Sequence, residues 1–195
     1  MTETQTDTHR HPPPHLMGWG RLAGMIAVST VAMFFLMYQL VFRLQDATFS
    51  MNRLLAALVM ACVMIVVMLG FMWPMYRGTG TKVAVLAGAA LTGLALLSVN
   101  RTQALIGDTA FLRAMIPHHS IAINNASKAT IRDLRVRDLA DGIIRSQVKE
   151  IAAMQQLLVD IGDAGANAGP RGPALTATPP VLTPDLAAEA AEMAR

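Results

Sequence analysis

Five residues near the middle of the chain, Met-Ile-Pro-His-His (Met115 to His119), place two imidazoles beside a thioether. Further along, Gln147, Glu150 and Met154 follow at spacings of three and four residues. Imidazole nitrogens and thioether sulfurs are suitable copper ligands, and thioethers favour Cu(I). Buried polar side chains also form hydrogen-bond networks that fix how helices pair. Two interpretations therefore stay open, a metal site and a structural polar seam.

Two helices are needed to position these residues. Gly107 and Asp108 provide a break and an N-cap, which predicts a first helix over residues 109–129. Asp133 is placed to cap a second helix over residues 134–161 after a short polar connection. Together they predict an antiparallel hairpin.

Both predicted helices carry a seam that repeats in alternating steps of four and three residues, the pattern that buries one face against a partner helix. His118 and Asn125 interrupt the first seam, and Gln147 and Glu150 interrupt the second. An unpaired carboxylate in such a seam is costly, so Glu150 needs a partner, and the histidines and Gln147 are the candidates. In the expected register, Glu150 lies opposite Leu112. The predicted seams are Phe111, Met115, His118, Ala122, Asn125 and Ala129, and Val136, Ala140, Ile143, Gln147, Glu150, Met154, Leu157 and Ile161.

Pro117 lies inside the first of these helices. It cannot donate a backbone hydrogen bond to the carbonyl of Arg113, so we expect the helix to kink or restart there. The freed carbonyl could contribute to a site, or Pro117 could simply set the angle of the hairpin.

The run from Phe111 to Ser120 resembles the domain of unknown function 305 (DUF305) family, and the resemblance covers residues 108–161. The resemblance implies a bacterial protein with a ferritin-like helical fold, of a kind often exported or membrane-attached. The downstream residues that carry it are Ile144, Gln147, Glu150, Ile151 and Met154.

Some members of that family are associated with copper, which implies copper as the metal here. The chain departs from many members, because Asn124 and Asn125 stand where those members place a further methionine. Catalysis is not expected, since the chain has no Glu-x-x-His pair, nucleophile with a base, or phosphate-binding loop. Carried over by position, the implied ligands are Met115, His118, His119 and Met154, and Asn125, Gln147 and Glu150 would orient a ligand or form the polar seam.

Three apolar stretches precede the hairpin, over residues 22–42, 54–73 and 83–99. A helix needs about 20 residues to cross the hydrocarbon, and the third stretch is at the lower limit. It is rich in small residues, which suits close packing against its neighbours. Trp19 and Trp73 lie near stretch ends, where interfacial aromatics belong. The sequence predicts three transmembrane helices.

The composition agrees with a membrane protein. Hydrophobic residues make up 53% and charged residues 15%, against about 25% charged residues in soluble domains. The net charge of +3 is scattered, so nucleic-acid binding is not expected. The single cysteine, Cys62, excludes an intrachain disulfide.

Positive residues favour a cytoplasmic N-terminus. The hairpin then lies outside the cytoplasm, in the periplasm if the protein spans the inner membrane of a Gram-negative bacterium. On this topology the cytoplasmic side receives Arg10, Arg21, Arg77 and Lys82, and the opposite side receives Arg43 and Arg53.

A methionine stripe runs along the second apolar stretch at Met60, Met64, Met68 and Met72. Thioethers at this spacing could form a path for Cu(I), but methionine also packs apolar cores. No intramembrane charge or histidine accompanies the stripe, so packing is the expected role.

The predicted fold is all-α, with three transmembrane helices followed by an antiparallel hairpin that forms half of a four-helix bundle. A two-helix hairpin is too small to bury its own core, so the expected partners are the lipid bilayer and a second copy of the chain. Gly162 is placed to end the second hairpin helix, and residues 186–193 could form a short amphipathic turn. The expected parts are a flexible tail over residues 1–20 with His9, His11 and His15, the membrane region over 21–101, the hairpin over 105–162, and a disordered tail over 163–195.

Overall fold

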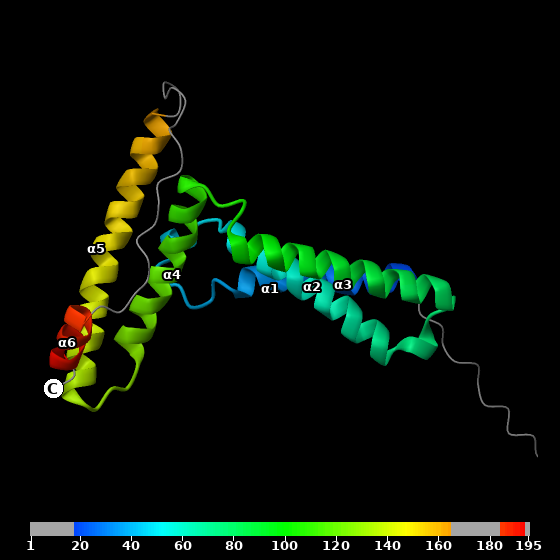
Figure 1. Ribbon diagram of the computed structural model, residues 1–195, viewed down its shortest axis with the longest axis horizontal. Coiled ribbons are helices and arrows are strands. Elements are labelled where there is room, and N and C mark those ends of the chain that lie inside the picture. The colour runs from blue at the N-terminus through cyan, green and yellow to red at the C-terminus, as the bar shows by residue number, and fades with distance from the viewer. Residues whose placement is uncertain (1–17, 165–183, 194–195) are drawn as a thin grey trace, which may run out of the picture. The chain divides into compact units, whose positions relative to one another are not determined.

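Every regular element in residues 18–164 and 184–193, which the computed structural model describes, is helical. The predicted all-α fold is therefore confirmed (Figure 1). The predicted tail histidines and most of the predicted C-terminal tail fall outside these residues. The elements are α1 (Trp19–Leu36), η1 (Leu44–Asp46), α2 (Met51–Phe71), η2 (Trp73–Met75), α3 (Thr79–Thr102), α4 (Asp108–Lys128), α5 (Leu134–Ala164) and α6 (Pro184–Met193), where η marks a short 3-10 helix.

The chain divides into two compact units. The first contains the chain up to Met33 together with Leu55–Val99, and the second contains Phe34–Leu54 together with the chain from Asn100 onward. The connection between α1 and α2 therefore belongs to the same unit as the hairpin.

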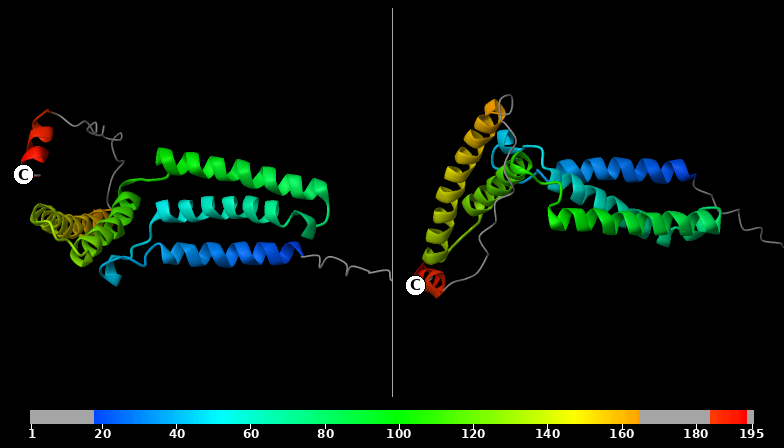
Figure 2. Two further views of the ribbon diagram at one scale, coloured as in Figure 1. Left: turned by 90° about the horizontal axis from the view of Figure 1, so that it is seen from below. Right: turned by 45° about the horizontal axis from the view of Figure 1, so that its top comes forward.

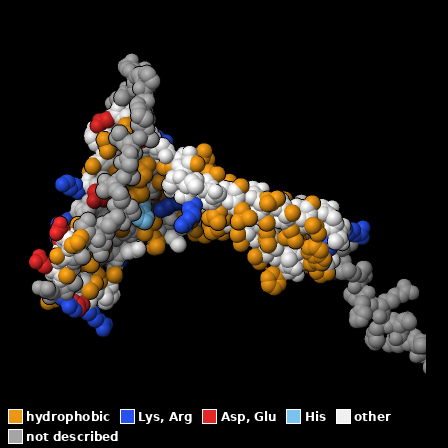
Figure 3. Space-filling model, in the orientation of Figure 1, with side chains coloured by type: hydrophobic (Ala, Val, Ile, Leu, Met, Phe, Trp, Pro, Cys, Tyr) orange, Lys and Arg blue, Asp and Glu red, His pale blue; other side chains and the backbone are white. Residues whose placement is uncertain are grey.

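In the first unit, three helices are long and apolar enough to cross a membrane. They are α1, α2 and α3, with 18, 21 and 24 residues. Figure 2 shows them running side by side, and Figure 3 shows hydrophobic side chains over much of their visible surface. The predicted number of apolar spans is confirmed.

The interior of this unit is apolar, around Leu22, Ile26 and Leu69. Three methionines of the stripe, Met64, Met68 and Met72, are partly buried against this cluster, whereas Met60 is 36% exposed. Their position supports the packing interpretation of the methionine stripe.

Small residues bring α2 and α3 together at one point. A Cβ atom at Gly93 would lie 3.0 Å from the Cβ atom of Cys62, so the two backbones approach more closely there than a larger residue allows. Gly88, which also lies in the predicted small-residue stretch, has open space around it. Only part of that stretch is used for close packing.

The first apolar helix is shorter than predicted. The apolar stretch continues to Phe42, but α1 ends at Leu36 and the chain passes through turns, with the Tyr38 amide donating to the carbonyl of Phe35. The Phe42 amide instead donates to the hydroxyl of Ser120, at 2.9 Å, in the second unit. Hydropathy does not distinguish apolar residues that meet lipid from those that meet another part of the protein.

The hairpin of α4 and α5 is confirmed, and its helices begin and end close to the predicted residues. The Asp133 carboxylate caps α5 by accepting the Arg135 amide at 2.9 Å. Two details were predicted wrongly. Gly107, not Asp108, stands at the N-cap of α4, and Gly162 lies inside α5, which continues to Ala164.

Pro117 does not interrupt α4, which is continuous through it. The carbonyl of Arg113, which Pro117 leaves without its helical donor, accepts a hydrogen bond from the Thr48 hydroxyl at 2.6 Å. A residue of the connection between α1 and α2 thus replaces the missing backbone donor. The freed carbonyl of Arg113 therefore has a structural role.

Replacing Thr48 with valine should therefore destabilise the second unit. The substitution keeps the shape of the side chain but removes the donor, which we expect to cost about 1 kcal/mol of unfolding free energy. Denaturant unfolding of the full chain in detergent, followed by circular dichroism, would measure the change. Thr130→Val, at an exposed position of the α4–α5 connection, is the matched control, and an equal effect of the two would contradict the capping role.

Candidate functional site

The thioethers of Met115 and Met154 lie in an apolar environment. Met154 is buried in a cluster with Leu112, Ile116 and Ile151, and the partly buried Met115 packs against the same cluster. The structure thus brings these two predicted ligands together, as packing residues of the α4–α5 interface.

His119 lies at the edge of this cluster with both ring nitrogens in contact with oxygen atoms. Its Nδ1 is 2.9 Å from the carbonyl oxygen of Met115, and its Nε2 is 2.7 Å from Oε2 of Glu150. A carbonyl oxygen only accepts hydrogen bonds, so Nδ1 carries a proton and donates. Nε2 faces the Glu150 carboxylate, so a metal ion would have to displace one of these two contacts to reach a ring nitrogen.

Glu150 completes the contact from α5. Its Oε1 accepts a hydrogen bond from the Ser146 hydroxyl at 2.7 Å, and half of its side chain is exposed to solvent. The Ser146 hydrogen bond, followed by the hydrogen bond and charge of His119, holds the pKa of Glu150 below its usual value. The predicted need of Glu150 for a partner is met by His119 and Ser146.

The remaining predicted site residues lie apart from this pair. His118 is exposed, with its ring centroid 6.0 Å from that of His119. Asn125 is also exposed, and its backbone carbonyl accepts the amide of Ala129 at the end of α4. The amide oxygen of Gln147 is buried without a hydrogen-bond partner in the described part of the chain.

The predicted seam on α4 and the predicted register are both displaced. Phe111, His118 and Asn125 are exposed, whereas the positions one residue later, Leu112 and His119, are buried. One residue corresponds to a rotation of about 100° on a helix. Glu150 contacts His119, whereas the predicted register placed it opposite Leu112. The buried face of α4 differs from the predicted one because α4 is covered on two sides. One side is covered by α5 and the other by the part of the α1–α2 connection that contains η1, which we call the η1 segment.

That second covered side contains polar residues that the sequence did not point to. The Ser120 hydroxyl is fully buried and donates to Oδ2 of Asp46 at 2.7 Å, while it accepts the Phe42 amide. Asp46 is only 3% exposed. A carboxylate between two apolar stretches was an available signal, but nothing in the sequence paired it with a serine 74 positions away.

Copper binding stays a prediction. No group of three or more His, Cys, Asp or Glu side chains within the described ranges could hold a metal ion. A site that used His119 would have to replace its contact with Glu150 or with Met115. His118 has no such contacts among the described residues, but it is exposed and does not belong to the apolar cluster that contains the two thioethers.

The two adjacent histidines should respond very differently to substitution. His119→Ala removes a buried ring and one of the two partners of Glu150, so we expect a loss of about 3 kcal/mol in unfolding free energy. His118→Ala changes an exposed position and should stay within about 0.5 kcal/mol of the unsubstituted chain. Parallel denaturant titrations compare them, and similar losses would refute the assigned geometry.

The lowered pKa of Glu150 also predicts a pH dependence. The ionised form is favoured in the folded state, so its contribution is fully present above the ordinary glutamate pKa of 4.5 and is lost as the pH falls through the lowered value. Glu150→Gln should flatten this part of the stability profile. Thermal unfolding measured in steps from neutral to acid pH would show it, with the exposed Glu189→Gln as the control that should leave the profile unchanged.

Comparisons with known proteins place the hairpin in a family. An uncharacterized protein, L153, from Acanthamoeba polyphaga mimivirus is 47% identical over 60 residues, which is 30% of this chain and 40% of that protein. The chain thus matches less than half the length of this relative. No solved structure matches significantly. Residues 86–172 match the family model described as domain of unknown function (DUF305). This part of the chain, with α4, α5 and the His119–Glu150 pair, is a DUF305 domain.

Proposed function

We propose that the protein is a membrane-anchored, non-catalytic assembly module whose α4–α5 hairpin pairs with the hairpin of a second copy. The observation that carries the proposal is a set of apolar side chains on α5 that remain partly exposed although α4 packs on the same helix. We call it the outer stripe. It consists of Val136, Leu139, Ile143 and Leu157, which are 49%, 50%, 38% and 48% exposed.

The spacing of the outer stripe is that of a helix–helix seam. Its members follow one another after three, four and fourteen residues, and fourteen residues are two heptads. The residues of α5 that are buried in the α4–α5 interface include Ala140, Ile151 and Met154. On a helix of 3.6 residues per turn, the centre of the outer stripe lies about 70° around α5 from the centre of these buried residues, so the outer stripe continues the apolar surface that packs on α4. An apolar surface on α5 that is wider than α4 covers indicates a second helical neighbour.

A second hairpin supplies the missing neighbour in the simplest way. Two hairpins make a four-helix bundle, in which each α5 buries part of its apolar surface against α4 and the outer stripe against the second copy. Glu150 lies in line with the outer stripe, seven residues from both Ile143 and Leu157, and is held by His119 and Ser146. Placed there, it would disfavour pairings in any other register, as buried polar groups do in coiled coils.

The three apolar helices would anchor this assembly. Their length and composition support spanning a bilayer, and the distribution of positive residues favours a cytoplasmic N-terminus with the hairpin on the opposite side. The protein would then present a paired helical domain at the outer surface of a bacterial cytoplasmic membrane.

A charge in the outer stripe should dissociate the assembly. We expect the unsubstituted chain to be dimeric in mild detergent, and Ile143→Lys to raise the dimer dissociation constant at least tenfold, because pairing would bury an unpaired ammonium group. Mass photometry across a dilution series would measure the dissociation constant.

Val159→Lys is the matched control. Val159 is 54% exposed on the same helix, but it lies on the side opposite the outer stripe, so the dimer should persist. A monomeric unsubstituted chain, or equal dissociation by both lysine variants, would overturn the proposal.

A further inference from the structure

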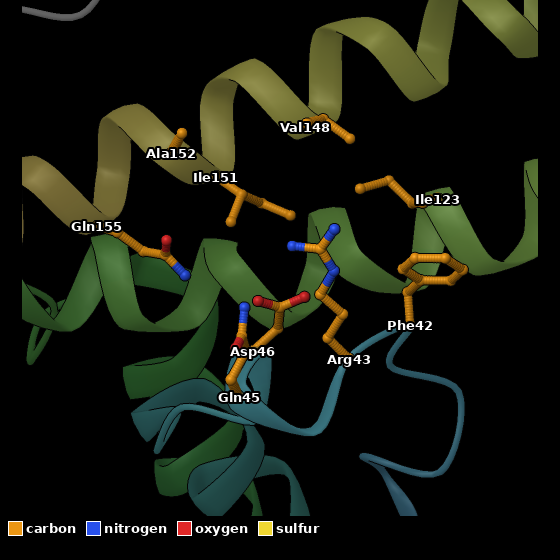
Figure 4. Close-up of a pocket in the computed structure, with 9 residues that line it drawn as sticks. All are labelled: Phe42, Arg43, Gln45, Asp46, Ile123, Val148, Ile151, Ala152 and Gln155. Carbon is orange, nitrogen blue, oxygen red and sulfur yellow. The ribbon is translucent and has the colours of Figure 1, made fainter.

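A cavity of about 120 Å³ lies between the segment around η1 and the hairpin, within the second unit. Its apolar side is formed by Ile123, Val148 and Ile151. Its polar side includes Arg43 and Asp46, which flank η1 or lie in it. Figure 4 shows these residues facing one another across the space between α4 and α5. The cavity is therefore amphipathic.

The anionic group of the cavity is Asp46. Its side chain is almost completely buried and receives one hydrogen bond, from the hydroxyl of Ser120. No cationic side chain of the described residues lies within ion-pairing distance of it. A buried carboxylate without a cationic partner is costly, so the cavity is suited to a positive charge beside Asp46.

The cationic group is Arg43. Its guanidinium forms no hydrogen bond or ion pair with any residue that the structure describes. In Figure 4 it extends from the η1 segment towards the gap between Ile123 and Ile151. A guanidinium with five free donors is well shaped to bind a carboxylate through two parallel hydrogen bonds.

We propose that this cavity binds a small aliphatic α-amino acid of the size of glycine or alanine. The carboxylate of the ligand pairs with Arg43, its ammonium group pairs with Asp46, and its aliphatic carbons contact Val148 and Ile151. The volume agrees with this size, since an engineered cavity of about 150 Å³ holds benzene, with six non-hydrogen atoms. This site uses different residues from the outer stripe and does not depend on self-association.

The charges of the cavity select a zwitterion over simpler ligands. A carboxylate alone would satisfy Arg43 but bring a second negative charge next to Asp46. An amine alone would satisfy Asp46 but leave the guanidinium unpaired. A ligand that carries both charges on neighbouring atoms pairs with both groups at once.

Calorimetric titration of the full chain in detergent tests the proposal with three ligands of similar size. We expect L-alanine to bind saturably with one site per chain. Propionate, which lacks the ammonium group, and ethylamine, which lacks the carboxylate, should bind at least tenfold more weakly. Equal binding of propionate would overturn the zwitterion assignment, and no saturable binding of glycine or alanine at millimolar concentration would overturn the site.

Two variants locate the binding. Arg43→Gln should weaken alanine binding at least tenfold, whereas Arg132→Gln, an exposed arginine in the α4–α5 connection, should leave it unchanged. Ala152→Leu adds carbon atoms to the cavity wall and should also weaken binding. Unfolding curves establish that each variant folds, and undiminished binding in folded Arg43→Gln and Ala152→Leu would place the ligand elsewhere.

Discussion

Pro117 removes one backbone donor from the middle of α4, and the structure around it is arranged to supply another. The donor comes from Thr48, which belongs to the connection between α1 and α2 and bonds to the carbonyl of Arg113. Ser120, one turn further along α4, binds the same connection through Phe42 and Asp46. The connection is thus held against α4 at two levels, and it forms one wall of the amphipathic cavity.

The opposite wall depends on a polar contact between α4 and α5. His119 joins the backbone of α4, at Met115, to the side chain of Glu150 on α5. Apolar side chains alone pack at several registers with similar energy, whereas a hydrogen bond between an imidazole and a carboxylate forms in only one register. The two thioethers nearby, Met115 and Met154, contribute bulk to the same interface.

The sequence was sufficient for features that depend on local pattern. Hydropathy located three apolar helices, and Asp133 correctly marked the start of α5. The sequence was not sufficient where two parts of the protein pack on the same helix. The apolar residues of α4 form two overlapping stripes, and the choice between them depends on the η1 segment, which covers one side. The sequence indicated that Glu150 needs a partner. For the same reason, it could not indicate that Glu150 lies opposite His119.

The contact between Thr48 and Arg113 also limits which fragments of this protein would keep the native contacts of the hairpin. The hairpin is continuous in sequence, but the unit to which it belongs includes residues 34–54. A recombinant piece that begins after α3 would lack Thr48 and Asp46, so the Arg113 carbonyl and the buried Ser120 hydroxyl would both lose their partners. A faithful soluble version would need the α1–α2 connection rejoined to the hairpin by a linker that replaces the membrane helices.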